Sequence, residues 1–275
     1  MRKSEMDPPK LTTVIETSPE SLQPAAVFHV IRDMFGFVLY MHQQIPSVLQ
    51  DLSLEFESLQ AQKEDLTGDG AMLLPSERRN RMTRMREVKQ GIRRLEKLMQ
   101  AVNNVENALR LLITHVPDVE GVVLALGATP VRPLHAYELS LSRCCNDASE
   151  RGDSDFGRTR AAEVLSRKVV RALISNGAGS DSYPGPSKLF LLAKAPPSFN
   201  LPMHFLPKRD FKYSKKLVPV RLQLKCRSQG VLSDALDVSQ TGSSTSSGNN
   251  TSSDLIWFQC RHTIKGLAFK TSLEE

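Results

Sequence analysis

The sequence contains few of the residues that build metal centres. It has four cysteines in 275 residues, of which Cys144 and Cys145 are adjacent and Cys226 and Cys260 stand alone. Structural zinc sites use cysteine pairs spaced as C-x-x-C, and the sequence has no such pair. The cysteines therefore argue against a zinc site, and we expect free thiols in a reducing compartment.

Catalytic signatures are also missing. The six histidines do not form an H-E-x-x-H pattern, and no P-loop, G-x-S-x-G or G-x-G-x-x-G stands in a strand-to-helix context. We therefore expect a protein that is not an enzyme and that needs no cofactor and no metal.

Targeting signals are equally scarce. The first residues, MRKSEMDPPK, lack the apolar core of a signal peptide. One apolar run, AAVFHVIRDMFGFVLYM, is long enough to suggest a membrane span, but His29, Arg32 and Asp33 lie in its middle. Charges at the centre of a bilayer are costly. We expect a buried helix, in a soluble protein of the nucleus and cytoplasm that binds no membrane.

The elements that the sequence does predict follow a simple order. Residues 1–23 are polar and proline-rich, which indicates a disordered arm, and residues 24–275 are expected to form a single domain. Apolar periodicity predicts helices over 24–60 (interrupted near Pro46), 76–112 and 156–175, and strands over 121–127, 135–142, 188–194 and 216–226. This order predicts an α+β fold with three main helices packed on a mostly antiparallel sheet.

Positive charge is unevenly distributed. The formal charge is +6, and basic residues concentrate in 76–97 and 206–216. A basic patch can bind nucleic acid or an acidic protein, although a solvated helix face is the simpler interpretation. Arginines at a helix start oppose the helix dipole, but no aromatic residues alternate with them, as single-strand binding requires. Direct nucleic-acid binding is thus the weaker expectation, and a basic chromatin- or DNA-associated structural protein is kept as the alternative function.

The C-terminal region combines a polar tether with an apolar segment. Residues 239–253 contain no apolar residue, and a flexible tether of this length reaches roughly 20 Å. The following segment, 254–270, is rich in β-forming residues and contains the single tryptophan. An exposed apolar strand promotes aggregation, so we expect this segment to pair with the chain's own sheet. An ordinary last strand after a long hairpin loop is the alternative, and it differs only in topology.

Four segments in the same order resemble the comet family, the adaptors that bind the spindle-checkpoint protein Mad-two. DLIWFQCRHTIKG resembles the family's C-terminal segment, and VLALGATPVRPLHAYELSL its strand pair. FLPKRDFKYSKKLVPVRLQLKC resembles its Pro-Lys segment and the strand after it. FHVIRDMFGFVLYMHQQIP resembles its first helix, which ends in a Tyr-x-x-Gln-Gln-aliphatic-Pro signature. The resemblance spans residues 24–270.

The resemblance implies a HORMA domain with a closed safety belt. The belt would cover residues 196–213, and the protein's own tail, with Ile256, Trp257 and Phe258, would occupy the position of the bound partner peptide as a strand. A HORMA protein that is itself a client, with an exchangeable belt, is the other interpretation, and the attached tail favours the adaptor.

The resemblance also implies two partner sites. The site for a closed HORMA client would use a turn and a helix, through Met41, Gln43, Gln44, Lys168, Val169, Val170 and Leu173. Val170 stands where the family has an aromatic anchor, and Met41 where it has a glutamine. The site for a hexameric AAA+ ATPase of the pachytene-checkpoint type would use Pro207 and Lys208.

The implied activity is that of an adaptor. The protein would present a closed HORMA protein, of the Mad-two or meiotic-axis type, to the ATPase for remodelling. This would silence the spindle checkpoint in the cell cycle and influence pairing, synapsis and recombination on meiotic chromosomes. Plant members of the family are associated with the meiotic role, and a plant member is one interpretation of the resemblance. The long Ser/Thr/Asn tether would suit an unfamiliar lineage.

Overall fold

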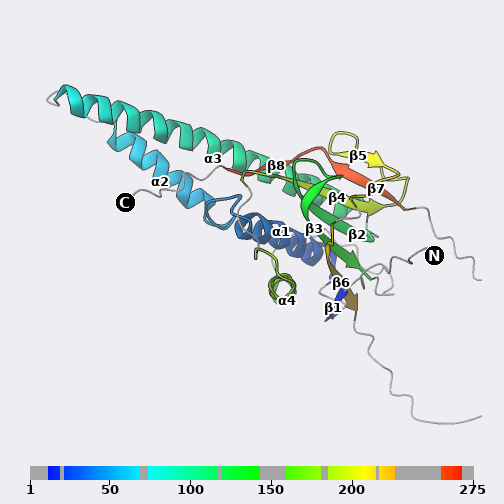
Figure 1. Cartoon of the computed structure of the whole chain (residues 1–275). Coiled ribbons are helices and arrows are strands. Elements are labelled where there is room, and N and C mark those ends of the chain that lie inside the picture. Colours follow the sequence, from blue (N-terminus) through cyan, green and yellow to red (C-terminus); the bar gives the residue numbers. More distant parts are fainter. Residues whose placement is uncertain are drawn as a thin grey trace, which may run out of the picture.

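A computed structural model describes residues 12–18, 22–67, 74–116, 119–142, 159–180, 185–214, 217–226 and 255–267. These residues form an α+β fold, as the sequence predicts (Figure 1). The helices are α1 (Pro24–Met41), α2 (Leu52–Asp65), α3 (Pro75–His115) and α4 (Arg160–Ser175). The strands are β1 (Thr12–Thr17), β2 (Gly121–Gly127), β3 (Pro133–Leu141), β4 (Lys188–Ala195), β5 (Phe205–Lys208), β6 (Val220–Cys226), β7 (Ile256–Cys260) and β8 (Ile264–Lys265).

The strands form one mixed sheet in the order β1-β6-β3-β2-β4-β7-β5, with β8 also paired to β4. The pairs β1–β6 and β3–β6 are parallel, and the other strand pairs are antiparallel. The expectation of a mostly antiparallel sheet is therefore confirmed, but the sequence did not predict the two parallel pairings, both of which involve β6. Parallel neighbours require a crossover, and the chain between β3 and β6 supplies one that includes α4.

Helix α1 lies in the core and contacts both α3 and α4. Its apolar side chains recur on more than one side, and those of Ile31, Met34, Phe35 and Leu39 are fully buried. Arg32 forms an ion pair with Glu106 of α3 at 2.6 Å, so the charge that interrupts the apolar run is neutralised inside the fold. By length and composition α1 also passes as a membrane span, with mean hydropathy 1.2, but 61% of it is buried within the protein. The prediction of a buried helix is confirmed.

Helices α2 and α3 form an arm that projects away from the sheet (Figure 1). We call residues 52–67 and 74–97 the arm. The 41 residues of α3 span about 60 Å at 1.5 Å per residue. The two helices are held together by a narrow apolar seam, in which Val88 and Leu95 are buried and Leu59 lies against Gly91. The sequence predicted the long helix but not that α2 runs beside it.

The N-terminal prediction is wrong for six residues. Thr12–Thr17, expected to be disordered, form β1 at one edge of the sheet, parallel to β6. Ile15 and Thr17 are buried there, while Val14 is exposed. Buried and exposed side chains alternate here, as in a strand, but the polar, threonine-rich composition of the segment does not predict one. Residues 1–11 and 19–21 lie outside the described residues.

The C-terminal prediction of a strand is confirmed. β7 lies between β4 and β5 and is antiparallel to both. Phe258 and Cys260 are buried, and Trp257 packs edge-on against Phe211 at 5.8 Å. The segment therefore fills an interior position in the sheet, next to the edge strand β5. The predicted tether, 239–253, lies outside the described residues.

The expectation of free thiols holds at one cysteine and fails at another. Cys260 is free and buried, and burial raises its pKa to about 11. Cys226, at the end of β6, is disulfide-bonded. Cys144 and Cys145 lie outside the described residues.

Candidate partner-binding surfaces

Helix α4 has one face in the core and one in solvent. Thr159 caps its start, where the Thr159 hydroxyl accepts a hydrogen bond from the Ala162 amide at 3.2 Å. Leu165, Val169 and Leu173 recur every four residues and are at most 1% exposed. This buried stripe fixes which side of the helix a partner can reach.

The burial of that stripe changes the predicted client site. Val169 and Leu173 are both 0% exposed, so they pack in the core and are not contact residues. Lys168 is exposed and Val170 is half-buried at the side of the helix. Sequence reasoning included the two core residues because the sequence alone does not distinguish an apolar residue that faces the core from one that faces a partner.

Sequence reasoning also missed the apolar residues that α4 does expose. Val164 is 46% exposed and Ile174 is 53% exposed, and the exposed residues Arg167 and Arg171 lie between them. These four positions follow steps of three, four and three residues, so they share one side of the helix. Their position along the helix could have revealed them, because Val164 and Ile174 fall outside the four-residue repeat that places Leu165 and Val169 in the core. We call Val164, Arg167, Lys168, Val170, Arg171 and Ile174 the outer face of α4.

Strand β1 is fastened along α4 and widens this surface. The Lys168 ammonium donates to the Glu16 carbonyl at 3.1 Å, and the Asn176 amide donates to the Thr13 hydroxyl at 3.0 Å. An open depression of about 380 Å³ lies between the two elements, lined by Thr17, Ser18, Arg160, Ala161, Val164, Leu165 and Lys168. Its lining combines apolar, hydroxyl and cationic side chains.

Two further predicted residues, Met41 and Gln43, lie at the end of α1 and in the turn that follows it. Met41 is half-buried, and a Cβ placed on Gly179 would come within 2.9 Å of the Met41 Cβ. Gly179 has a φ of +82°, so the close approach and the backbone both require glycine there. Gln43 is exposed and adopts a left-handed φ of 53°. Met41 therefore lies against the turn that follows α4, and Gln43 is exposed in the turn that follows α1.

Gln44 has a different role from the one predicted. It is fully buried, its amide group donates to the His42 carbonyl at 2.7 Å and the Gly185 carbonyl at 3.2 Å, and its Oε1 accepts from the Ser187 amide at 2.6 Å. Its backbone carbonyl accepts from the Leu267 amide at 2.8 Å. Gln44 thus joins the end of α1, the start of β4 and the C-terminal segment, and it is not a partner contact.

The predicted ATPase site lies at the opposite edge of the sheet from β1. Pro207 and Lys208 are exposed on β5, the edge strand, where they pair with Phe258 and Trp257 of β7. An edge strand tolerates proline because its outward amide has no partner strand. Arg209 and Lys212 are exposed just beyond, so this corner is basic.

A pair of histidines joins β5 to the C-terminal segment. His204 Nδ1 and His262 Nε2 lie 3.1 Å apart, and the Arg261 amide donates to the His204 carbonyl at 2.8 Å. Burial, and then the charge of His204, lower the pKa of His262. Within the described ranges, no three His, Cys, Asp or Glu side chains are grouped to hold a metal ion.

Comparison with known proteins adds no identification. No protein-family model matches the chain, and no curated protein sequence matches it.

Proposed function

We propose that the chain is an adaptor of the comet family with a HORMA-type fold. It binds a closed HORMA protein and delivers it to a hexameric AAA+ ATPase. The observation that carries this proposal is the position of β7, which occupies the place between β4 and β5 that a partner peptide would take in a closed HORMA domain.

The segment 196–213 supports the closed arrangement. It leaves β4, contributes β5 and crosses over the C-terminal strand, as a safety belt would. Phe199 packs edge-on against Phe205 and Phe258, with ring centroids 5.4 and 4.9 Å away. Because these rings come from the belt and from the tail, each segment helps to bury the other.

The client site of the adaptor is the outer face of α4 with the adjoining turn. Two exposed apolar side chains, Val164 and Ile174, supply contact area in place of the family's aromatic anchor. Arg167, Lys168 and Arg171 add positive charge around them. Such a surface suits a partner with small apolar side chains flanked by carboxylates.

The ATPase site of the adaptor is the corner of β5 at Pro207 and Lys208. It is separated from the client site by the width of the sheet, so both partners have access at once. The chain does not need catalytic groups of its own, because the ATPase carries out the remodelling of the client. In this role the protein acts in the nucleus and cytoplasm, in spindle-checkpoint silencing and on meiotic chromosomes.

Chromatography with light scattering tests the proposal. The protein is mixed with closed Mad-two, and with closed meiotic-axis HORMA proteins, from the same organism. Wild type should form a one-to-one complex with one of them, while Val164→Glu and Ile174→Glu should abolish it. Leu54→Glu is the matched control, because Leu54 is 63% exposed on α2, away from the client site.

Two results would contradict the proposal. One is the absence of a complex with any closed HORMA protein while circular dichroism shows wild-type folding. The other is a complex that the two α4 variants leave intact. For the second partner, Lys208→Glu should weaken binding to the ATPase and leave the client complex unchanged.

A further inference from the structure

The strongest concentration of charge in the molecule lies outside both adaptor surfaces. Residues 75–97 of α3 carry nine Lys or Arg and three Glu, a formal charge of +6 that equals the charge of the entire chain. The neighbouring α2 carries four acidic residues and one lysine, a formal charge of −3. Positive charge is thus confined to one helix of the arm.

Five of these residues form a row along α3. Arg79, Arg86 and Arg93 are seven residues apart, which is about two turns or 10.5 Å per step. Lys89 and Lys97 continue the row at steps of three and four residues. We call these five residues the basic ridge. It is about 27 Å long, from 18 residues at 1.5 Å each.

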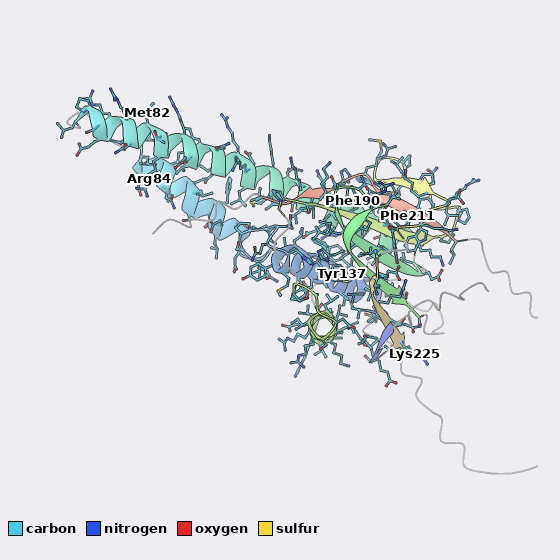
Figure 2. The ribbon with its side chains drawn as sticks, in the orientation of Figure 1. Met82, Arg84, Tyr137, Phe190, Phe211 and Lys225 are labelled. Atoms are coloured by element: carbon cyan, nitrogen blue, oxygen red, sulfur yellow. The ribbon has the colours of Figure 1, made fainter. Side chains whose placement is uncertain are left out.

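The ridge is open to solvent and faces away from α2. All five side chains are exposed, whereas Val88, Leu95 and Leu98 are buried on the opposite side of the helix. Figure 2 shows nitrogen-tipped side chains standing out from the side of α3 that faces away from α2. In the described part of the chain, none of the five forms an ion pair.

The chemistry of the arm restricts the class of partner. α3 contains no Phe, Tyr or Trp, so it offers no surface on which the bases of a single strand could stack. Met82 is the one large apolar side chain that is markedly exposed on the described residues of α3. Protein interfaces depend on buried apolar anchors, whereas contacts to a phosphate backbone need only cations.

We propose that the basic ridge binds the phosphate backbone of double-stranded DNA, without sequence preference. A ridge of about 27 Å covers roughly eight base pairs at 3.4 Å per pair. The arm extends away from both adaptor surfaces, so DNA binding would hold the adaptor near chromosomes without covering either site (Figure 1).

Fluorescence anisotropy with a labelled 24-base-pair duplex tests this proposal. The full chain should bind with a Kd on the order of 10⁻⁶–10⁻⁴ M and lose affinity steeply as salt rises. The triple variant Arg79→Gln, Arg86→Gln, Arg93→Gln should bind at least tenfold more weakly. Its slope of log K against log salt should be smaller by about 2.7, at about 0.9 per lost phosphate contact.

Two further variants serve as controls. The first is a triple variant that removes the same charge from exposed positions on the sheet, Lys188→Gln, Lys225→Gln, Lys265→Gln. It should bind the duplex within about twofold of wild type. Replacing the three ridge arginines with lysine should keep the wild-type salt slope. Mad-two binding by the arginine-to-glutamine triple should be unchanged, which separates this proposal from the adaptor proposal.

Three outcomes would overturn the proposal. The first is that wild type shows no binding to the duplex at 100 mM salt and about 10⁻⁴ M protein. The second is an equal loss of affinity in the ridge and sheet triples, which would mean that only net charge matters. The third is displacement of the duplex by poly-glutamate at equal charge concentration, which would assign the ridge to acidic proteins.

Discussion

At the residue scale, Gln44 shows that a residue of the Tyr-x-x-Gln-Gln-aliphatic-Pro signature can stabilise the fold instead of binding a partner. Its amide group satisfies three backbone groups, and two of them, at Gly185 and Ser187, come from the entry to β4. Gln43 is therefore exposed and has a left-handed backbone, whereas Gln44 is buried in the turn that follows α1. The same amide also explains Gly266, because a Cβ there would collide with it.

The first prediction concerns this amide. Gln44→Leu keeps the volume but leaves the Ser187 amide and two carbonyls without partners. Each buried unsatisfied group costs about 1–3 kcal/mol, so the loss of three should lower the free energy of unfolding by at least about 3 kcal/mol in urea denaturation. Gln43→Asn is the control and should change it by less than about 0.5 kcal/mol, since asparagine tolerates a positive φ. Equal urea midpoints for Gln44→Leu and wild type would refute the structural role.

The second prediction concerns pH. The pKa of His262 is lowered in the folded state, so the unfolded chain binds more protons as pH falls below the ordinary value of 6.5. Stability should be fully present above pH 6.5 and should decrease as pH falls through the lowered pKa. The titratable group beside the His262 ring is His204, and the Cys260 thiol contacts the His262 backbone.

Urea denaturation between pH 7.5 and 5.5 measures this effect. The stability of wild type should fall more than that of His262→Gln, because glutamine does not titrate. Parallel pH profiles for the two proteins would show that the histidine pair does not couple to folding.

At the element scale, α3 contains an evident weak point. Gly91 lies inside the helix, where glycine costs about 1 kcal/mol relative to alanine. A Cβ at this position would meet Leu59 at 3.5 Å, which is an ordinary contact. The third prediction is that Gly91→Ala raises the free energy of unfolding by about 0.5–1 kcal/mol in urea. The exposed neighbour Gln90→Ala should change it by only a few tenths, and a destabilised Gly91→Ala would mean that the seam has no room there.

Periodic elements were predictable from the sequence. The long stripe of α3 and the glycine-bounded run of β2 carry their own signal, and both were placed to within a few residues. β1 and β5 were not predicted, because six threonine-rich residues and four residues containing Pro207 have little local preference for a strand. Such strands form because the edges of a larger sheet select them.

The candidate client site was only half predictable. Apolar periodicity indicated that α4 has a buried stripe, but it did not separate the buried Val169 from the exposed Val164. That distinction depends on the rotation of the helix against α1, which is a tertiary property. Buried polar side chains such as Gln44 are missed for a similar reason, because their partners lie far away in the sequence.

At the scale of the whole molecule, the sheet depends on a segment distant in sequence. β7 is the hydrogen-bonded neighbour of both β4 and β5, so removing it isolates β5 from the sheet. The fourth prediction is that a chain ending at Ser239 loses its cooperative thermal transition or melts well below wild type. A separate peptide of residues 254–267 should restore the transition. A truncated chain that melts like wild type would show that β7 contributes nothing to the fold.

The position of β7 also bears on the protein's synthesis. Sixty residues, 196–255, separate the end of β4 from the start of β7. At 5–20 residues per second, a ribosome needs about 3–12 s to make them. During that interval the nascent β4 has an open edge and β5 has no strand to pair with. Unpaired edges of this kind are where nascent chains aggregate or recruit chaperones, so expression yield should depend on whatever protects this edge until β7 emerges.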